Sequence, residues 1–180
     1  MKFSIQFSFR RPHRIPCLLM IPLLLLATLC PAHADEAPVV SSGTAVLMDA
    51  DSGQVLYESD GAERCFPAST TKIMTCMLAL EHCSLDETVV TPKSSLDIVP
   101  GSSAIYVTPG EELTMEQCLH ALMMASANDV ANAVAEHVAG SLDAFVDMMN
   151  ARAEEIGATD THFVNAHGLH SDDHYTTARD

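Results

Sequence analysis

The sequence has few basic residues, no long apolar run and no cysteine pair with the spacing of a metal site. Lysine and arginine number 9 against 24 aspartates and glutamates, and the formal net charge is −15. Such an acidic chain repels nucleic acid, so we expect no nucleic-acid partner. Cys76 and Cys83 lie two helical turns apart, about 10 Å, too far for a disulfide within one helix. We therefore predict buried free thiols at Cys65, Cys76, Cys83 and Cys118.

Residues 1–34 have the organisation of an export signal. Four basic residues precede an apolar run over 17–30, and Ala32-His33-Ala34 fits the cleavage pattern of a signal peptidase. A membrane-spanning helix needs about 20 apolar residues, and this run is shorter and interrupted by proline. We expect cleavage after Ala34 and an extracytoplasmic location, in the periplasm or at the outer face of the cytoplasmic membrane or cell wall. Removal of four basic and no acidic residues changes the net charge from −15 to −19.

The polar residues 35–43 are predicted to be a linker, and a β-hairpin and a helix are predicted after it. Two short apolar stretches, 44–48 and 54–58, flank the turn-forming sequence Asp49-Ala50-Asp51-Ser52-Gly53. A helix is expected over 69–82, in which the apolar residues Ile73, Met77 and Leu80 follow helical spacing. Residues 85–112 read mostly as loop, with short extended pieces at 88–90 and 104–107.

Capping residues predict three further helices. Thr114 and Gln117 have the spacing of a capping box for a helix that reaches Ala125 and carries Leu119, Leu122 and Met123. A second helix is expected from about Val130 to Gly140, with Asn128 or, better, Asp129 as its cap. A third, capped by Ser141, ends at Gly157. The predicted fold class is α/β (α+β), a helical lobe together with the start of an antiparallel sheet.

Ser69 and Lys72 are the first candidate catalytic pair. Residues three apart on a helix share a face, so the lysine amine can reach the serine hydroxyl. A serine needs a base to become a good nucleophile, and a lysine acts as that base once burial and the helix dipole lower its pKa. The alternative is that Ser69 caps the helix and Lys72 is solvated. Small apolar residues continue their shared face, which favours an inward-pointing Lys72: Cys76, Ala79 and Cys83.

Ser126 and Asn128 form a second candidate at the junction of two helices. A hydroxyl there can relay a proton, and an amide can bind both a carbonyl and a substrate amide. The segment 163–169, Phe-Val-Asn-Ala-His-Gly-Leu, reads as a turn. Four histidines cluster near it, but they lack a helical ligand pair with a carboxylate, so we expect no metal and no cofactor: His162, His167, His170 and His174.

Together these features closely resemble the low-molecular-mass penicillin-binding proteins, the serine-type D-Ala-D-Ala carboxypeptidases of the peptidase S11 family. The resemblance rests on the hairpin, Phe66-Pro67-Ala68-Ser69-Thr70-Thr71-Lys72, Ser126-Ala127-Asn128-Asp129 and 163–169, in this order, and it covers 44–180. It implies a serine β-lactamase-like fold. The implied partners are peptidoglycan stem peptides ending in D-Ala-D-Ala and β-lactam antibiotics.

The resemblance also implies residue roles. Ser69 would attack the carbonyl between the two D-alanines, Lys72 would take its proton, Ser126 would relay that proton and Asn128 would orient the peptide and Lys72. The family's third motif, K-T-G, has no match here. The last residues, 176–180, resemble the middle of a family helix, so we expect a truncated catalytic domain over 44–180. Membrane attachment, where it exists, would come from residues beyond these.

Two other functions remain open from the sequence. A serine β-lactamase would use the same Ser69 and Lys72 but needs rapid deacylation, and we find no equivalent of the dedicated glutamate base. A catalytically inactive cell-wall-binding module would fit the missing K-T-G if the natural chain ended at Asp180.

Overall fold

A computed structural model describes residues 38–180, so the predicted export signal and residues 35–37 of the predicted linker lie outside the described residues. The hairpin is confirmed: β1 (Ala45–Met48) pairs antiparallel with β2 (Val55–Ser59). The Asp49 carboxylate accepts hydrogen bonds from the backbone N–H and the hydroxyl of Ser52, which closes the connecting turn.

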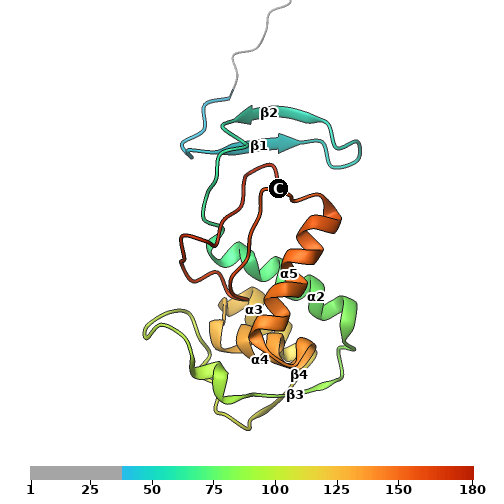
Figure 1. The fold of residues 1–180 in the computed structure, drawn as a ribbon, viewed down its shortest axis with the longest axis vertical. Coiled ribbons are helices and arrows are strands. Elements are labelled where there is room, and N and C mark those ends of the chain that lie inside the picture. Colours follow the sequence, from blue (N-terminus) through green and yellow to red (C-terminus); the bar gives the residue numbers. More distant parts are fainter. Residues whose placement is uncertain (1–37) are drawn as a thin grey trace, which may run out of the picture. The chain divides into compact units, whose positions relative to one another are not determined.

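Four α-helices form most of the regular secondary structure of the described chain: α2 (Thr71–His82), α3 (Met115–Ala125), α4 (Asn128–Ala139) and α5 (Leu142–Ile156). Helix α4 packs against each of the other three (Figure 1). Its first eight residues, 128–135, are all buried, and most of them are small or β-branched. Small side chains let three neighbouring helices approach closely, which makes α4 the centre of the core.

A second pair of strands lies beside these helices. β3 (Thr88–Val90) pairs antiparallel with β4 (Glu112–Thr114), and the short 3-10 helix η3 (Lys93–Leu96) packs on α4. The extended piece expected at 88–90 is β3. The stretch expected to be mostly loop ends one residue early, because Glu112 already belongs to β4, the strand that pairs with β3. The extended piece expected at 104–107 forms no strand, since it has no neighbouring strand to pair with.

The helix signals are confirmed in four places and wrong in one. The Thr114 capping box and the Ser141 cap form, and α4 and α5 end at the left-handed glycines Gly140 and Gly157. Helix α4, however, starts at Asn128 with Ala127 as an N-cap that makes no side-chain bond. The expected Asp129 cap does not form, because its carboxylate accepts hydrogen bonds from the backbone N–H groups of Ile105 and Val107.

The buried face of α2 is the one on which Lys72 was predicted to point inward, and the apolar residues Ile73 and Leu80 lie outside it. Ile73 and Leu80 are 60% and 57% exposed, and Met123 of α3 is 58% exposed. Helix α2 instead buries its polar and small face, which includes Thr71, Lys72, Met74, Thr75, Cys76, Leu78 and Ala79. Spacing alone could not identify this face, because the polar residues on it are satisfied by partners far away in the sequence.

The C-terminal segment returns to the hairpin end of the described chain. Thr176 forms a β-bridge with Cys65, and Arg179 pairs with Glu58 at 2.7 Å. No helix forms over 176–180, contrary to the family resemblance, because the Thr176 backbone groups bond to Cys65. Within 38–180, no helix is long and apolar enough to cross a membrane.

Candidate active site

Ser69 lies at the surface in the 3-10 helix η2 (Ala68–Thr70), which runs directly into α2. The preceding Ala68 has a φ of 48°, a left-handed conformation that is unusual for a residue other than glycine. The Thr70 hydroxyl donates to the carbonyl of Pro67 at 2.7 Å and holds the turn. Ser69 is therefore exposed on a short, fixed segment and can be reached by a substrate.

Lys72 is buried one helical turn away, with only 2% of its surface exposed. Its amine lies 3.4 Å from the Ser69 hydroxyl oxygen. It also donates to the side-chain oxygen of Asn128 and to the backbone carbonyl of His167, both at 2.7 Å. The inward direction predicted for this lysine is confirmed, and three acceptors surround its amine.

The two short hydrogen bonds fix the orientation of the Lys72 amine. A carbonyl oxygen only accepts hydrogen bonds, so the two short bonds use two N–H groups of the amine. In the neutral state the remaining lone pair faces Ser69, the position from which it can accept the hydroxyl proton. Burial lowers the pKa of Lys72 to about 8, against the smaller opposing effect of Cys76, so neutral amine is present near neutral pH.

Ser126 reaches the same hydroxyl from another helix. It is the C-cap of α3 in a left-handed conformation, with a φ of 53°, and its hydroxyl donates to the Ser69 oxygen at 2.9 Å. Asn128 follows as the first residue of α4, and its backbone N–H donates to Ser103 at 2.9 Å. The structure thus brings together all four residues singled out from the sequence.

The segment 163–169 forms the wall of the site behind Lys72. The Asn165 side chain accepts from the backbone N–H groups of His167 and Gly168 and donates to the carbonyl of Leu169. These bonds aim the His167 carbonyl at the lysine. Gly168 has a φ of 89°, and a Cβ there would lie 1.8 Å from the carbonyl oxygen of Ala68. Only glycine lets this turn approach the segment that carries the serine.

Two buried threonines of α2 also hold this wall, and the sequence reasoning missed them. Thr75 donates to the carbonyl of Ala166 at 2.6 Å, and the Thr71 hydroxyl lies 2.7 Å from Nε2 of His174. The other ring nitrogen of His174 accepts from the N–H of Val164. Their spacing could have indicated this role, because Thr71 and Thr75 are four residues apart and therefore lie on one face of the helix that follows Ser69.

Asp129 is a further structural residue that the sequence reasoning misassigned. Its buried carboxylate accepts from the N–H groups of Ile105 and Val107, at 3.3 and 3.0 Å, and from that of Val130 at 3.0 Å. It therefore fixes the chain at 105–107 next to the start of α4. The intervening Tyr106 is 80% exposed with a φ of 62°.

The histidines near the end of the chain make hydrogen bonds or a surface contact. His167 and His174 are buried, and burial lowers the pKa of each to about 4, so both are neutral at pH 7. His162 contacts the carbonyl of Asp173, and the exposed His170 lies 3.5 Å from Asp172.

The cysteines match the prediction of buried free thiols in part. Cys76 and Cys118 are buried, Cys65 and Cys83 are half-buried, and all four are free.

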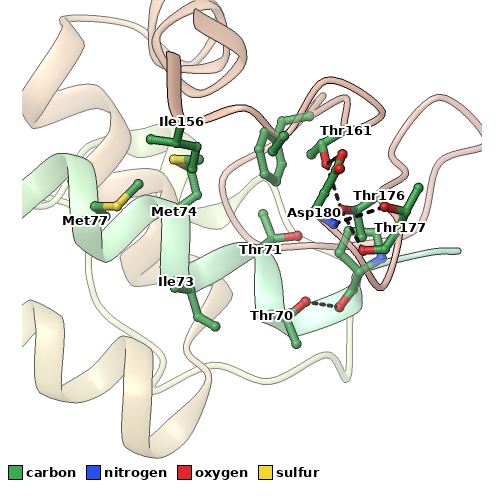
Figure 2. A pocket seen from close by; sticks show the side chains of 13 residues that line it. Thr70, Thr71, Ile73, Met74, Met77, Ile156, Thr161, Thr176, Thr177 and Asp180 are labelled. Atoms are coloured by element: carbon green, nitrogen blue, oxygen red, sulfur yellow. Dashed lines mark hydrogen bonds between the residues drawn. The ribbon is translucent and has the colours of Figure 1, made fainter. Parts of the chain in front are cut away.

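An apolar cavity of about 340 Å³ lies on a different side of the first turns of α2. Figure 2 shows Met74, Met77 and Ile156 at one end of it and Thr161 and Asp180 near the other. Ser69, Lys72, Ser126 and Asn128 do not line it. The hydroxyl–amine cluster is therefore separate from this cavity.

The described helices and strands match solved penicillin-binding proteins and DD-transpeptidases, which have the β-lactamase-like fold. A Mycobacterium tuberculosis D-alanyl-D-alanine carboxypeptidase aligns with a TM-score of 0.75 and 34% identity, over 83% of this chain and 56% of that one. Penicillin binding protein 6B from Escherichia coli aligns with a TM-score of 0.76 and 29% identity, over 82% and 50%. The predicted fold class is confirmed.

Sequence comparison defines the family. The chain belongs to the D-alanyl-D-alanine carboxypeptidase family, peptidase S11, whose model matches residues 31–180. It is 39% identical over 142 residues to the D-alanyl-D-alanine carboxypeptidase DacF of Bacillus subtilis, and 34% identical over 175 residues to DacA of Escherichia coli. These matches cover 76% and 87% of this chain but 36% and 43% of the relatives. The chain thus spans less than half the length of these two relatives.

Proposed function

We propose that the protein is a serine-type D-Ala-D-Ala carboxypeptidase that removes the terminal D-alanine from peptidoglycan stem peptides. The observation that carries this proposal is the arrangement around one oxygen atom. The Ser69 hydroxyl lies 3.4 Å from the buried Lys72 amine and 2.9 Å from the Ser126 hydroxyl. A nucleophile, a base and a proton relay are the groups that acyl transfer through a serine requires.

Acylation would begin at Ser69. Its oxygen forms a bond to the carbonyl carbon between the two D-alanines, and its proton moves to Lys72. The tetrahedral intermediate then collapses, the C–N bond breaks, and the leaving amine takes a proton that returns from Lys72 through Ser126. Asn128 holds Lys72 throughout, because its side-chain oxygen receives one N–H of the amine.

Deacylation would restore the enzyme. Water adds to the ester carbonyl and gives its proton to the same base; the ester C–O bond then breaks, and the departing Ser69 oxygen takes that proton back. The products are free Ser69 and a stem peptide that is one D-alanine shorter. A β-lactam, whose strained amide resembles the D-Ala-D-Ala end, would acylate Ser69 in the same way and remain as a long-lived ester.

The test is an intact mass spectrum of the full-length natural protein after incubation with benzylpenicillin. We expect a gain of one penicilloyl group, mapped to the peptide that contains Ser69. Ser69→Ala should lose the adduct, while Ser42→Ala, a control at an exposed serine before the hairpin, should keep it. A folded natural protein that gains no adduct and releases no D-alanine from a stem peptide would refute the proposal and favour an inactive cell-wall-binding module.

The same samples separate a carboxypeptidase from a β-lactamase. An adduct that persists for minutes or longer, together with D-alanine release, supports the carboxypeptidase. Rapid turnover of penicillin without D-alanine release supports the β-lactamase. The proposal includes export, supported by the signal-like sequence of residues 1–34, because the peptidoglycan substrate lies outside the cytoplasmic membrane.

A further inference from the structure

Three side chains with metal-binding atoms meet at the end of α2 away from Ser69. They are Cys83, Glu87 and His137, and their sulfur, carboxylate oxygen and ring nitrogen atoms all lie within 4.8 Å of one another. In the part of the chain that the structure describes, no other three cysteine, histidine or acidic side chains come this close. The cluster has no part in the acyl-transfer chemistry described above.

The protein backbone already holds this cluster in place. Cys83 is the C-cap of α2, and its N–H donates to the carbonyl of Ala79 at 2.9 Å. One oxygen of the Glu87 carboxylate accepts from the N–H of Ser84 at 2.7 Å, and the other lies 3.3 Å from Nε2 of His137. The ligand atoms therefore need little rearrangement to surround one ion.

The cluster is also accessible from solvent. The His137 side chain is 25% exposed and that of Glu87 is 43% exposed. His137 is the one ion-pair partner that the described residues offer to the Glu87 carboxylate, so no lysine or arginine competes there with a cation. Burial, followed by the Glu87 carboxylate, raises the pKa of the Cys83 thiol, so the metal-free cysteine is protonated and a poor nucleophile.

The donor set selects the kind of metal. A thiolate and an imidazole suit zinc and related transition metals, whereas magnesium and calcium prefer oxygen ligands alone. Zinc bound by three protein side chains keeps a fourth position for water or another ligand. We propose that Cys83, Glu87 and His137 form a zinc-binding site with one coordination position open.

The position of the site gives it a structural consequence. At their first turns α2 and α4 meet through the bond between Lys72 and Asn128, and at their last turns through Cys83 and His137. The two helices therefore run in the same direction, and these contacts are about 16 Å apart along α2. Bound zinc would join the far ends of the two helices that carry Lys72 and Asn128.

The test uses the full-length natural protein, reduced and freed of metal by a chelator that is then removed. Zinc affinity is measured by competition with a chromophoric chelator, and cobalt is added separately to record its absorption spectrum. We expect one zinc per chain and a thiolate-to-cobalt charge-transfer band. Cys83→Ser and His137→Gln should each weaken zinc binding at least about 100-fold.

Matched controls change the same residue types elsewhere. Cys65→Ser removes another half-buried cysteine, and His120→Gln removes an exposed histidine on α3. Both should bind zinc like the unaltered protein. Zinc should also raise the melting temperature of the unaltered protein and of the controls but not of the site variants, because a ligand that binds only the folded state stabilises it.

Three results would overturn the proposal: no stoichiometric zinc, equal affinity in the site variants, or a cobalt spectrum without the thiolate band. The cobalt spectrum needs no variant, so it decides the matter even where Cys83→Ser does not fold.

Discussion

The pH dependence of acylation tests the assignment of Lys72 as the base. Burial lowers its pKa from 10.5 to about 8, and the amine acts only when it is neutral. At pH 7 about a tenth of the Lys72 side chains are then neutral, against about three in ten thousand at the ordinary pKa. The buried site therefore supplies about 300-fold more active base at pH 7.

The sign follows from the protonation state. Because the base must lose a proton, the acylation rate rises with pH and levels off above the pKa. A pKa near 8 predicts a rise of about tenfold from pH 7 to pH 9, followed by a plateau. A lysine with a pKa of 10.5 would give a rise of about 100-fold over the same range and no plateau.

The assay is the second-order rate constant for labelling of the full-length natural protein by a fluorescent penicillin, measured from pH 6 to 10. Lys72→Met should reduce the rate at least about 100-fold at every pH. Lys93 is the other lysine among the described residues and is exposed, so Lys93→Met is the matched control and should leave the profile unchanged. A rate that does not change with pH, or that keeps rising tenfold per pH unit beyond pH 9, would refute the reasoning.

Three further predictions follow from the site and the chain. Gly168→Ala should abolish most penicillin labelling and lower the melting temperature, because its Cβ would lie 1.8 Å from a backbone oxygen. The control Gly140→Ala, at a φ of 81° with open space around the added Cβ, should cost only about 1–2 kcal/mol of stability in a denaturation experiment. Equal effects of the two substitutions would contradict this reasoning. His174 has a pKa of about 4, so the unfolded chain binds a proton below pH 6.5 that the folded chain does not, and stability falls as the pH falls. From pH 7 to 4.5 this loss is about 2 kcal/mol for His174, and His167 adds a similar loss, so urea unfolding of His174→Gln should show a loss about 2 kcal/mol smaller than that of the unaltered protein. Export predicts a mature N-terminus directly after Ala34, which N-terminal sequencing of protein from the cell envelope checks; an intact N-terminus would argue against cleavage.

Patterns within one or two helical turns could be read from the sequence. The Thr114 capping box, the Ser141 cap and the glycine ends of α4 and α5 form as expected, because each depends on residues a few positions apart. The same holds for Ser69 and Lys72, which share a face through helix geometry alone.

The apolar spacing of a helix did not by itself identify its buried side. Ile73 and Leu80 have helical spacing, yet α2 buries the side that carries Lys72 and Thr75. Those polar groups are tolerated inside because Asn128, His167 and Ala166 supply acceptors from more than 50 positions away. The start of α4 was misplaced for the same reason, since the Asp129 carboxylate accepts hydrogen bonds from the distant backbone at 105–107 instead of capping the helix.

The local chemistry could be read from the order of residues: a nucleophile and an amine one turn apart, a hydroxyl and an amide at a helix junction, and the order of motifs that marks the family. The packing of the helices brings these groups together, lets two fixed carbonyl oxygens orient the Lys72 amine, and places the pKa of that amine near 8. It also decided that Cys83 and His137, 54 positions apart, lie side by side. The physical reason is that spacing fixes direction along one helix, whereas burial, desolvation and hydrogen-bond partners depend on which helices pack together.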